Sequence, residues 1–198
     1  MKTARVEAFS DGVFAVAITL LVLDLRAPLT SGSLIQALAD EWPEFAAFAI
    51  SFVVIGVIWV NHHSIFDRID HVDRPLLFIN LGLLMSVVLI PFVTSLYAQY
   101  VARGGSQAEV ASALFIGTQL LMSFGFQGCT LWINAHPELS TSPIRPATLS
   151  ERIRFAAGMF VYVGCLPLSF FSPLLVLALA GAVAAYYVLD QISVRVTE

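Results

Sequence analysis

The stretch Arg5-Val-Glu-Ala-Phe9-Ser10-Asp11-Gly12-Val-Phe-Ala-Val16-Ala-Ile-Thr19-Leu20-Leu-Val-Leu23-Asp-Leu25 decides the fold of this chain. It is long enough to cross a bilayer, which needs roughly 20 mostly apolar residues. A carboxylate such as Asp11 inside such a helix costs a few kcal/mol unless it has a partner. The run does not resemble a secretory signal peptide, because it contains Asp11, is too long, and lacks a small-residue cleavage site before Pro28. It therefore predicts a membrane helix with a functional or structural acid.

The composition of the whole chain indicates an integral membrane protein. Of 198 residues, 58% are hydrophobic and only 12% are charged, whereas soluble domains have about 25% charged residues. Cys129 and Cys165 lie inside apolar runs, where a thiol behaves as a small hydrophobe, so we expect no disulfide. The small net charge of −4 and the lack of a basic cluster give no indication of nucleic-acid binding.

Apolar runs recur along the chain and predict an all-α, polytopic membrane protein with six transmembrane helices in one domain, residues 1–198. Pro75 suits a first helical position, and Pro91 and Pro167 are tolerated inside membrane helices as local kinks. No soluble domain of useful size remains, so the function must lie in the membrane. The expected helices cover residues 5–25, 42–61, 75–101, 109–133, 150–171 and 173–192.

The basic residues predict the orientation of these helices. With the amino terminus inside, one side of the membrane holds eight Lys and Arg residues and the other holds only Arg26 and Arg103. The positive-inside rule then places both termini in the cytoplasm of a multi-pass protein of the cell membrane. The eight residues are Lys2, Arg5, Arg68, Arg74, Arg145, Arg152, Arg154 and Arg195.

Helical geometry divides the first helix into an apolar and a polar direction. At about 100° per residue, Val16, Leu20 and Leu23 share one stripe with Thr19 at its flank. Asp11 lies roughly 140° round the helix from Val16. Periodicity alone favours a stripe that faces lipid or the protein core, with a pore-lining face as the less common alternative.

A second polar group ends the second apolar span, at Trp59-Val-Asn61-His62-His63. The topology returns this group to the membrane side of Ser10 and Asp11. Trp59, Asn61 and a histidine supply hydrogen-bond donors that a buried Asp11 needs. The alternative is that Trp59 is an interfacial belt residue and that the histidines belong to a solvated loop.

The pattern Arg5-x-x-x-Phe9-Ser10-Asp11, followed by the apolar run to Leu23, resembles the first helix of the transmembrane protein 175 family of potassium channels. The resemblance extends to Trp59–His63 and to the overall length, so it covers the whole chain. It implies a K⁺ channel without a cofactor. It also implies that each six-helix subunit joins a homotetramer in the bilayer, with the first helix lining a central pore.

The resemblance assigns roles to the stripe of the first helix. The family's narrow constriction falls on Val16, and Leu20 and Leu23 would form further apolar rings. Apolar constrictions gate pores by dewetting, and no Thr-Val-Gly-Tyr-Gly filter is present. Because Val16 is small, Leu20 is the alternative narrowest ring. Selectivity for K⁺ over Na⁺ should be modest, because it would follow only from the lower dehydration cost of K⁺ at a weak site. Thr19 is a candidate cation ligand unless its hydroxyl bonds back to its own helix.

The resemblance also implies that the polar residues are structural clamps and do not bind ions. Asp11 would be held by polar residues of neighbouring helices, and pairing with an arginine would relieve the cost of both charges. The residues expected in this network are Arg5, Phe9, Ser10, Asp11, Trp59, Asn61 and His62.

Three other functions remain to be weighed. Histidines and acids gather at His62, His63, Asp67, Asp70, His71 and Asp73, but a solvated, self-paired loop is favoured over a metal site. A proton-coupled secondary transporter could use Asp11 and a histidine as a relay, although no internal repeat is evident. An enzyme is not expected, because no Ser-His or His-Glu-x-x-His arrangement is present.

Overall fold

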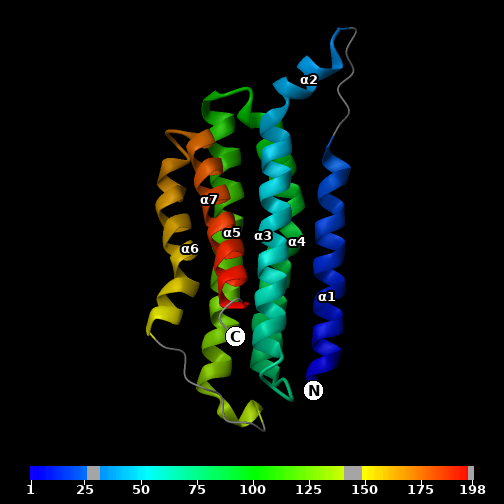
Figure 1. Cartoon of the computed structure of the whole chain (residues 1–198), viewed down its shortest axis with the longest axis vertical. Helices are drawn as coiled ribbons and strands as arrows, with labels where there is room; N and C mark the ends of the chain where they lie inside the picture. Colours follow the sequence, from blue (N-terminus) through cyan, green and yellow to red (C-terminus); the bar gives the residue numbers. More distant parts are fainter. Residues whose placement is uncertain (26–31, 141–148, 196–198) are drawn as a thin grey trace.

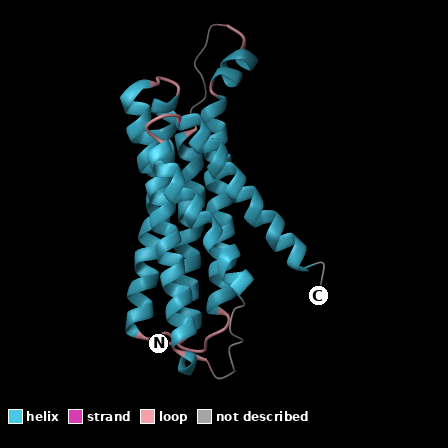
Figure 2. Ribbon diagram, turned by 90° about the vertical axis from the view of Figure 1, so that its left-hand side faces the viewer, coloured by secondary structure: helices cyan, strands magenta, loops and turns pink. Residues whose placement is uncertain are grey.

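The computed structural model describes residues 1–25, 32–140 and 149–195. The described part is built from α-helices, two short 3₁₀ turns and one isolated bridge, which confirms the all-α fold class. The long helices other than α7 run along one common direction, with α1 at one edge of the bundle and α6 near the other (Figure 1), while α7 leaves them at an angle (Figure 2). The long helices are α1 (Thr3–Leu20), α3 (Trp42–Phe66), α4 (Arg74–Val101), α5 (Gly105–Ala135), α6 (Leu149–Leu168) and α7 (Pro173–Arg195).

Most of these helices are long and apolar enough to cross a membrane. Among the described residues this holds for α1 with its following turn, α3, α4, α5 and α7. In α6 the apolar helix is shorter and covers Ala156–Leu168. The chain is therefore a multi-pass membrane protein.

The helix bounds differ from the sequence expectation at several places, among them α5, which begins at Gly105 instead of residue 109, and α6, which ends at Leu168 instead of residue 171. The second long helix continues to Phe66 instead of ending at residue 61, so both histidines lie in its last turns and not in a loop. The first helix ends in a 3₁₀ turn, η1 (Leu21–Asp24). A short helix, α2 (Leu34–Asp40), precedes α3, and its seven residues are too few to give a membrane signal. Arg26 and Arg145 lie outside the described residues.

The α4–α5 hairpin begins and turns where its sequence dictates. Asp73 caps α4, because its carboxylate accepts the Leu76 N–H at 3.0 Å. Pro75 follows inside the first turn, where its missing N–H costs nothing. The turn into α5 uses Gly104 and Gly105, whose φ values of 67° and 68° favour glycine.

Glycines also set the packing of α4 against α5. A Cβ atom added at Gly125 would lie 2.9 Å from the Leu83 Cα, and one added at Gly128 would lie 3.0 Å from the Ile79 Cγ2. Small residues of this kind let two membrane helices approach closely. The α4–α5 pair therefore forms a tight support, and the apolar cluster on it includes the buried residues of α1 and α3.

The start of α1 is tied to two loops at the same end of the bundle. The Met1 amino group donates to the Val72 carbonyl at 2.7 Å, and the Val72 N–H donates back to the Met1 carbonyl at 2.8 Å. The Asp70 N–H in turn donates to the Leu139 carbonyl at 2.9 Å. These bonds fix the amino-terminal end of α1 against the α3–α4 loop.

We expect Gly125→Ala to lower the thermal stability of the purified protein, because the new methyl group meets backbone of α4 that cannot move aside. Gly117→Ala, in the same helix, is the control, since nothing lies within 4 Å of its added Cβ. The control should be neutral or gain up to about 1 kcal/mol from helix propensity. Equal melting temperatures for the two variants would contradict the close α4–α5 packing.

Candidate functional site

Helix α1 buries one face and leaves the opposite face open. Its buried positions follow helical spacing and are Thr3, Val6, Ser10, Phe14 and Ala17, and Leu21 of the following η1 turn continues them. This face rests on α3 and α4. The position of each remaining α1 side chain follows from this rotation of the helix.

A hydrogen-bonded chain of buried side chains joins α1 to α4 and α3. The Asn80 Nδ2 donates to Ser10 Oγ at 3.0 Å, and the Asn80 Oδ1 lies 2.8 Å from His62 Nε2. Because an amide oxygen only accepts, the proton of this second bond belongs to His62 Nε2. All three side chains are almost fully buried. We call Ser10, Asn80 and His62 the buried triad.

Aromatic rings surround the histidine of the buried triad. Phe66 stacks on His62 with a 4.2 Å separation of ring centroids, and Phe14 meets it edge-on at 5.4 Å. These rings exclude water from the hydrogen bonds. A buried polar group that loses its partner in such surroundings costs about 1–3 kcal/mol, so the buried triad locks α1 against α3 and α4.

Beside the buried triad, a second set of polar contacts joins α1 to α3 at the surface of the subunit. The Trp59 Nε1–H donates to Asp11 Oδ1 at 2.8 Å, which is the partnership expected from the sequence. The expectation that Asp11 is buried is wrong for the single subunit, because its side chain is exposed. One turn earlier, Glu7 Oε1 lies 3.6 Å from His63 Nδ1.

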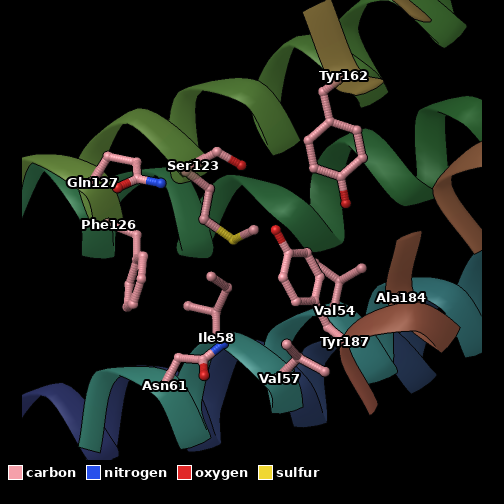
Figure 3. A pocket seen from close by; sticks show the side chains of 11 residues that line it. Val54, Val57, Ile58, Asn61, Ser123, Phe126, Gln127, Tyr162, Ala184 and Tyr187 are labelled. Carbon is pink, nitrogen blue, oxygen red and sulfur yellow. The ribbon is translucent and has the colours of Figure 1, made fainter. Parts of the chain in front are cut away.

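Asparagine 61 is the member of the expected network that the structure moves elsewhere. Asn61 lines a hollow between α3, α5, α6 and α7 (Figure 3). Trp59 instead reaches α1, where it bonds to Asp11. Two residues of separation turn a helix by about 200°, so both cannot face α1. Asn80 takes the expected place. The sequence does carry a sign of this role, because Asn80 is an isolated amide on the same buried face of α4 as Leu76, Leu83 and Val87.

The other expected members of the network lie on the open face of α1. Arg5 and Phe9 are exposed, and among the described residues no ion pair of Arg5 is formed. A role for these two in the network stays a prediction about the assembled protein.

The expected pore residues lie on the same open face. The side chains of Val16 and Leu23 are 58% and 74% exposed, and that of Leu20 is 38% exposed. Leu23 belongs to the η1 turn, where the helix tightens. The Thr19 hydroxyl donates to its own helix, to the Val16 carbonyl at 2.9 Å and the Ala15 carbonyl at 3.0 Å. The arrangement is thus an anchored helix with an unpartnered, mostly apolar face.

The histidines and acids of the α3–α4 region have separate partners. His62 belongs to the buried triad and His63 lies near Glu7. Asp73 caps α4 and also accepts the Trp132 Nε1–H at 3.1 Å. Within residues 1–25, 32–140 and 149–195, no three His, Cys, Asp or Glu side chains are grouped to hold a metal ion.

Comparison with known proteins gives consistent matches. The family model "Endosomal/lysosomal potassium channel TMEM175" matches residues 5–91, which hold Ser10, Asp11, His62 and Asn80. A potassium channel of Streptomyces collinus is 41% identical over 100% of this chain and 97% of its own length. A chicken relative named endosomal/lysosomal proton channel TMEM175 is 30% identical over 68% of this chain and 28% of its own length.

A solved structure has the same fold. The crystal structure of a lysosomal potassium-selective channel TMEM175 homolog from Chamaesiphon minutus superposes with a TM-score of 0.80. It is 34% identical, and the match covers 95% of this chain and 97% of that chain.

We expect Ser10→Ala to destabilise the protein by about 1–3 kcal/mol, because it leaves a buried Asn80 N–H without an acceptor. Ser64→Ala is the matched control, since the exposed Ser64 hydroxyl only donates to the Val60 carbonyl of its own helix. Thermal unfolding in detergent measures both. A larger loss of stability in the Ser64 variant would refute the anchoring role of the buried triad.

Proposed function

This chain belongs to the TMEM175 family of potassium channels, and we propose that four copies form a K⁺ pore around the open face of α1. Its relatives are named ion channels, and it is not an enzyme. In the proposed assembly, α1 lines the pore, α3 and α4 hold it from behind, and the remaining helices complete the subunit. No cofactor is needed, and the permeant ion is K⁺.

The observation that carries this proposal is the buried polar anchor behind α1, which turns one mostly apolar face of this helix away from its own subunit. Large exposed apolar faces mark contact with another chain or with lipid. The buried triad fixes which face is open, so Val16 and Leu23 point away from the rest of their own subunit. A helix that only had to contact lipid would need neither this anchor nor an exposed Asp11.

Around a fourfold axis, Val16, Leu20 and Leu23 would give three stacked apolar rings. Such a neck closes by dewetting and opens when it widens enough for water to enter. A cation crossing it must shed part of its hydration shell, which K⁺ does at a lower cost than Na⁺. Selectivity from this source is modest.

The Thr19 hydroxyl bonds back to its own helix, which is the alternative that the sequence left open, but a weak role as an ion ligand is compatible with these bonds. A hydroxyl has one proton and two acceptor lone pairs. Its proton is directed to the Val16 and Ala15 carbonyls, so the oxygen can offer its lone pairs to a cation. The threonine would then be a weak ligand one turn beyond the Val16 ring.

The orientation proposed for the subunit places both termini in the cytoplasm of a cell-membrane protein. The start of α1 and the α3–α4 loop lie at one end of the bundle, where Met1 bonds to Val72 (Figure 1). That end carries Lys2, Arg5, Arg68 and Arg74. The positive-inside rule assigns it to the cytoplasm.

A second candidate function is proton-coupled transport with Asp11 and a histidine as a relay. It is favoured by the exposed Asp11 carboxylate and the nearby Glu7–His63 pair. Against it, Asp11 bonds to Trp59, while His62 bonds to Asn80 in the buried triad. The two residues therefore belong to separate hydrogen-bonded groups.

A planar-bilayer recording of the purified protein under opposed K⁺ and Na⁺ gradients distinguishes the two functions. A K⁺ channel gives currents whose reversal potential follows the K⁺ gradient. A proton-coupled transporter instead gives a saturating flux that follows an imposed pH gradient. Currents that reverse at the proton equilibrium potential would therefore overturn the proposal.

We expect Val16→Ser to enlarge the K⁺ current or to weaken K⁺ over Na⁺ selection, because a hydroxyl ring keeps water in the neck. Val88→Ser is the control: Val88 is a comparably exposed valine, 50% against 58%, but on α4. Single-channel conductance and reversal potential measure both variants. If Val16→Ser behaves like wild type, the Val16 row does not line the pore.

A further inference from the structure

Helix α5 carries a polar face through the middle of the membrane, on the far side of α3 from α1. Ser112, Gln119, Ser123 and Gln127 follow one another at seven, four and four residues. This spacing places their side chains on one helical face. Among the described elements, α5 packs on α4, α6, α7 and α3, so this face lies inside the subunit.

Two of these side chains are buried without a hydrogen-bond partner. Both the oxygen and the nitrogen of the Gln119 amide are enclosed and unpaired, and so is the Ser112 hydroxyl. Each residue has 0% exposure. An unsatisfied buried polar group costs about 1–3 kcal/mol, and a native protein keeps one only for a reason such as an internal water or a functional role.

A hollow of about 40 Å³ lies beside the Ser123 and Gln127 end of the same face, between α3, α5, α6 and α7. Each of these helices contributes a polar group to its lining, and the hydroxyls of Tyr162 on α6 and Tyr187 on α7 both point inward (Figure 3). Its other polar lining residues are Asn61, Ser123 and Gln127.

The hollow and the unpaired amide belong to neighbouring turns of α5. The Ser123 residue lines the hollow, and its hydroxyl donates to the backbone carbonyl of Gln119 one turn earlier, at 2.9 Å. Long helical side chains lean toward the amino-terminal end of their helix, so the Gln119 amide extends from the hollow toward Ser112. The polar side chains thus stand in one row along α5, from Gln127 at the hollow to Ser112.

We propose that the hollow and this row of polar side chains bind a chain of ordered water molecules inside each subunit. The Gln119 amide and the Ser112 hydroxyl would bind the water at the end of the chain farthest from Gln127. An internal water needs at least about 10–15 Å³ and two to four polar partners, so the hollow has room for two or three. Its polar lining residues are neutral. They suit water better than a bare cation, which needs several oxygen ligands or an acid to replace its hydration shell.

This water chain is separate from the K⁺ pathway. Helix α3 contributes Val54, Val57 and Ile58 to the hollow and, on another face, presents Trp59 to α1. In Figure 2, α7 is the helix that ends at C and leaves the other helices at an angle. The hollow lies between α3 and α5 on one side and α6 and α7 on the other, so the water in it is outside the proposed pore.

Radiolytic hydroxyl-radical footprinting of the full-length protein in lipid nanodiscs tests for this water directly. Radicals formed from bound water oxidise the nearest side chain, and Met122 lines the hollow while being only 2% exposed. We expect Met122 to be oxidised in the wild-type protein and markedly less in Gln127→Leu. Met1, which is 52% exposed at the end of the bundle, is the internal reference. A Met122 that stays unoxidised while Met1 reacts would overturn the proposal.

A double-mutant cycle tests the inner end of the chain. If water joins the two residues, Ser112→Ala should lower the melting temperature by about 2–4 °C in the wild type, but have little effect in the Gln119→Met background. If the site is dry, Gln119→Met should raise the melting temperature, because it removes two unpaired atoms, and the two changes should be additive. K⁺ currents of the folded variants should match wild type, which separates this outcome from a failure of the channel proposal.

Discussion

The hydrogen bonds from Asn80 to Ser10 and His62 set the rotation of α1, and the rest of the account depends on that rotation. An apolar helix in a membrane has no hydrophobic force to choose which side faces its neighbours, because lipid tails are as apolar as leucine. Polar groups supply the missing specificity, since a turn of about 100° would place the Ser10 hydroxyl in hydrocarbon. One short chain of bonds therefore decides which side chains are left for the outside.

The anchor and the apolar face are two consequences of the same helix. The buried positions of α1, from Val6 to Ala17, pack against α3 and α4, and α4 is itself packed closely on Gly125 and Gly128 of α5. The opposite side keeps Val16 and Leu23 exposed together with the small residue Gly12, which has no neighbour within 4 Å. In the proposed tetramer this face would meet its copies around the pore axis. The buried triad would hold each α1 helix in place from the protein side, and its apolar face would form the proposed pore constriction without a filter of charged groups or backbone carbonyls.

The sequence predicted the elements well because apolar length and proline or glycine positions are local signals. It also identified Trp59 as the donor to Asp11, since the topology returns the end of α3 to the level of Asp11. The sequence could not predict how each helix is rotated about its own axis relative to its neighbours. Asn61 and Asn80 are both lone amides in apolar helices, and only the packed bundle shows that Asn80 meets Ser10 while Asn61 turns toward α5. The exposure of Asp11 in the subunit likewise could not be predicted from the sequence, because it depends on how much of α1 the neighbouring helix α3 covers.

The most direct test of the central claim is the reactivity of a thiol at Val16 while the channel conducts. The native Cys129 and Cys165 are free but buried, so a Val16→Cys protein in a planar bilayer presents one accessible thiol on α1. If the anchored helix turns this position toward the ion path, Ag⁺ added to the aqueous chamber should block the K⁺ current of Val16→Cys and leave that of the wild type unchanged. An unaltered current in Val16→Cys, with conduction otherwise normal, would mean that this face contacts lipid, and the account of the pore would be wrong.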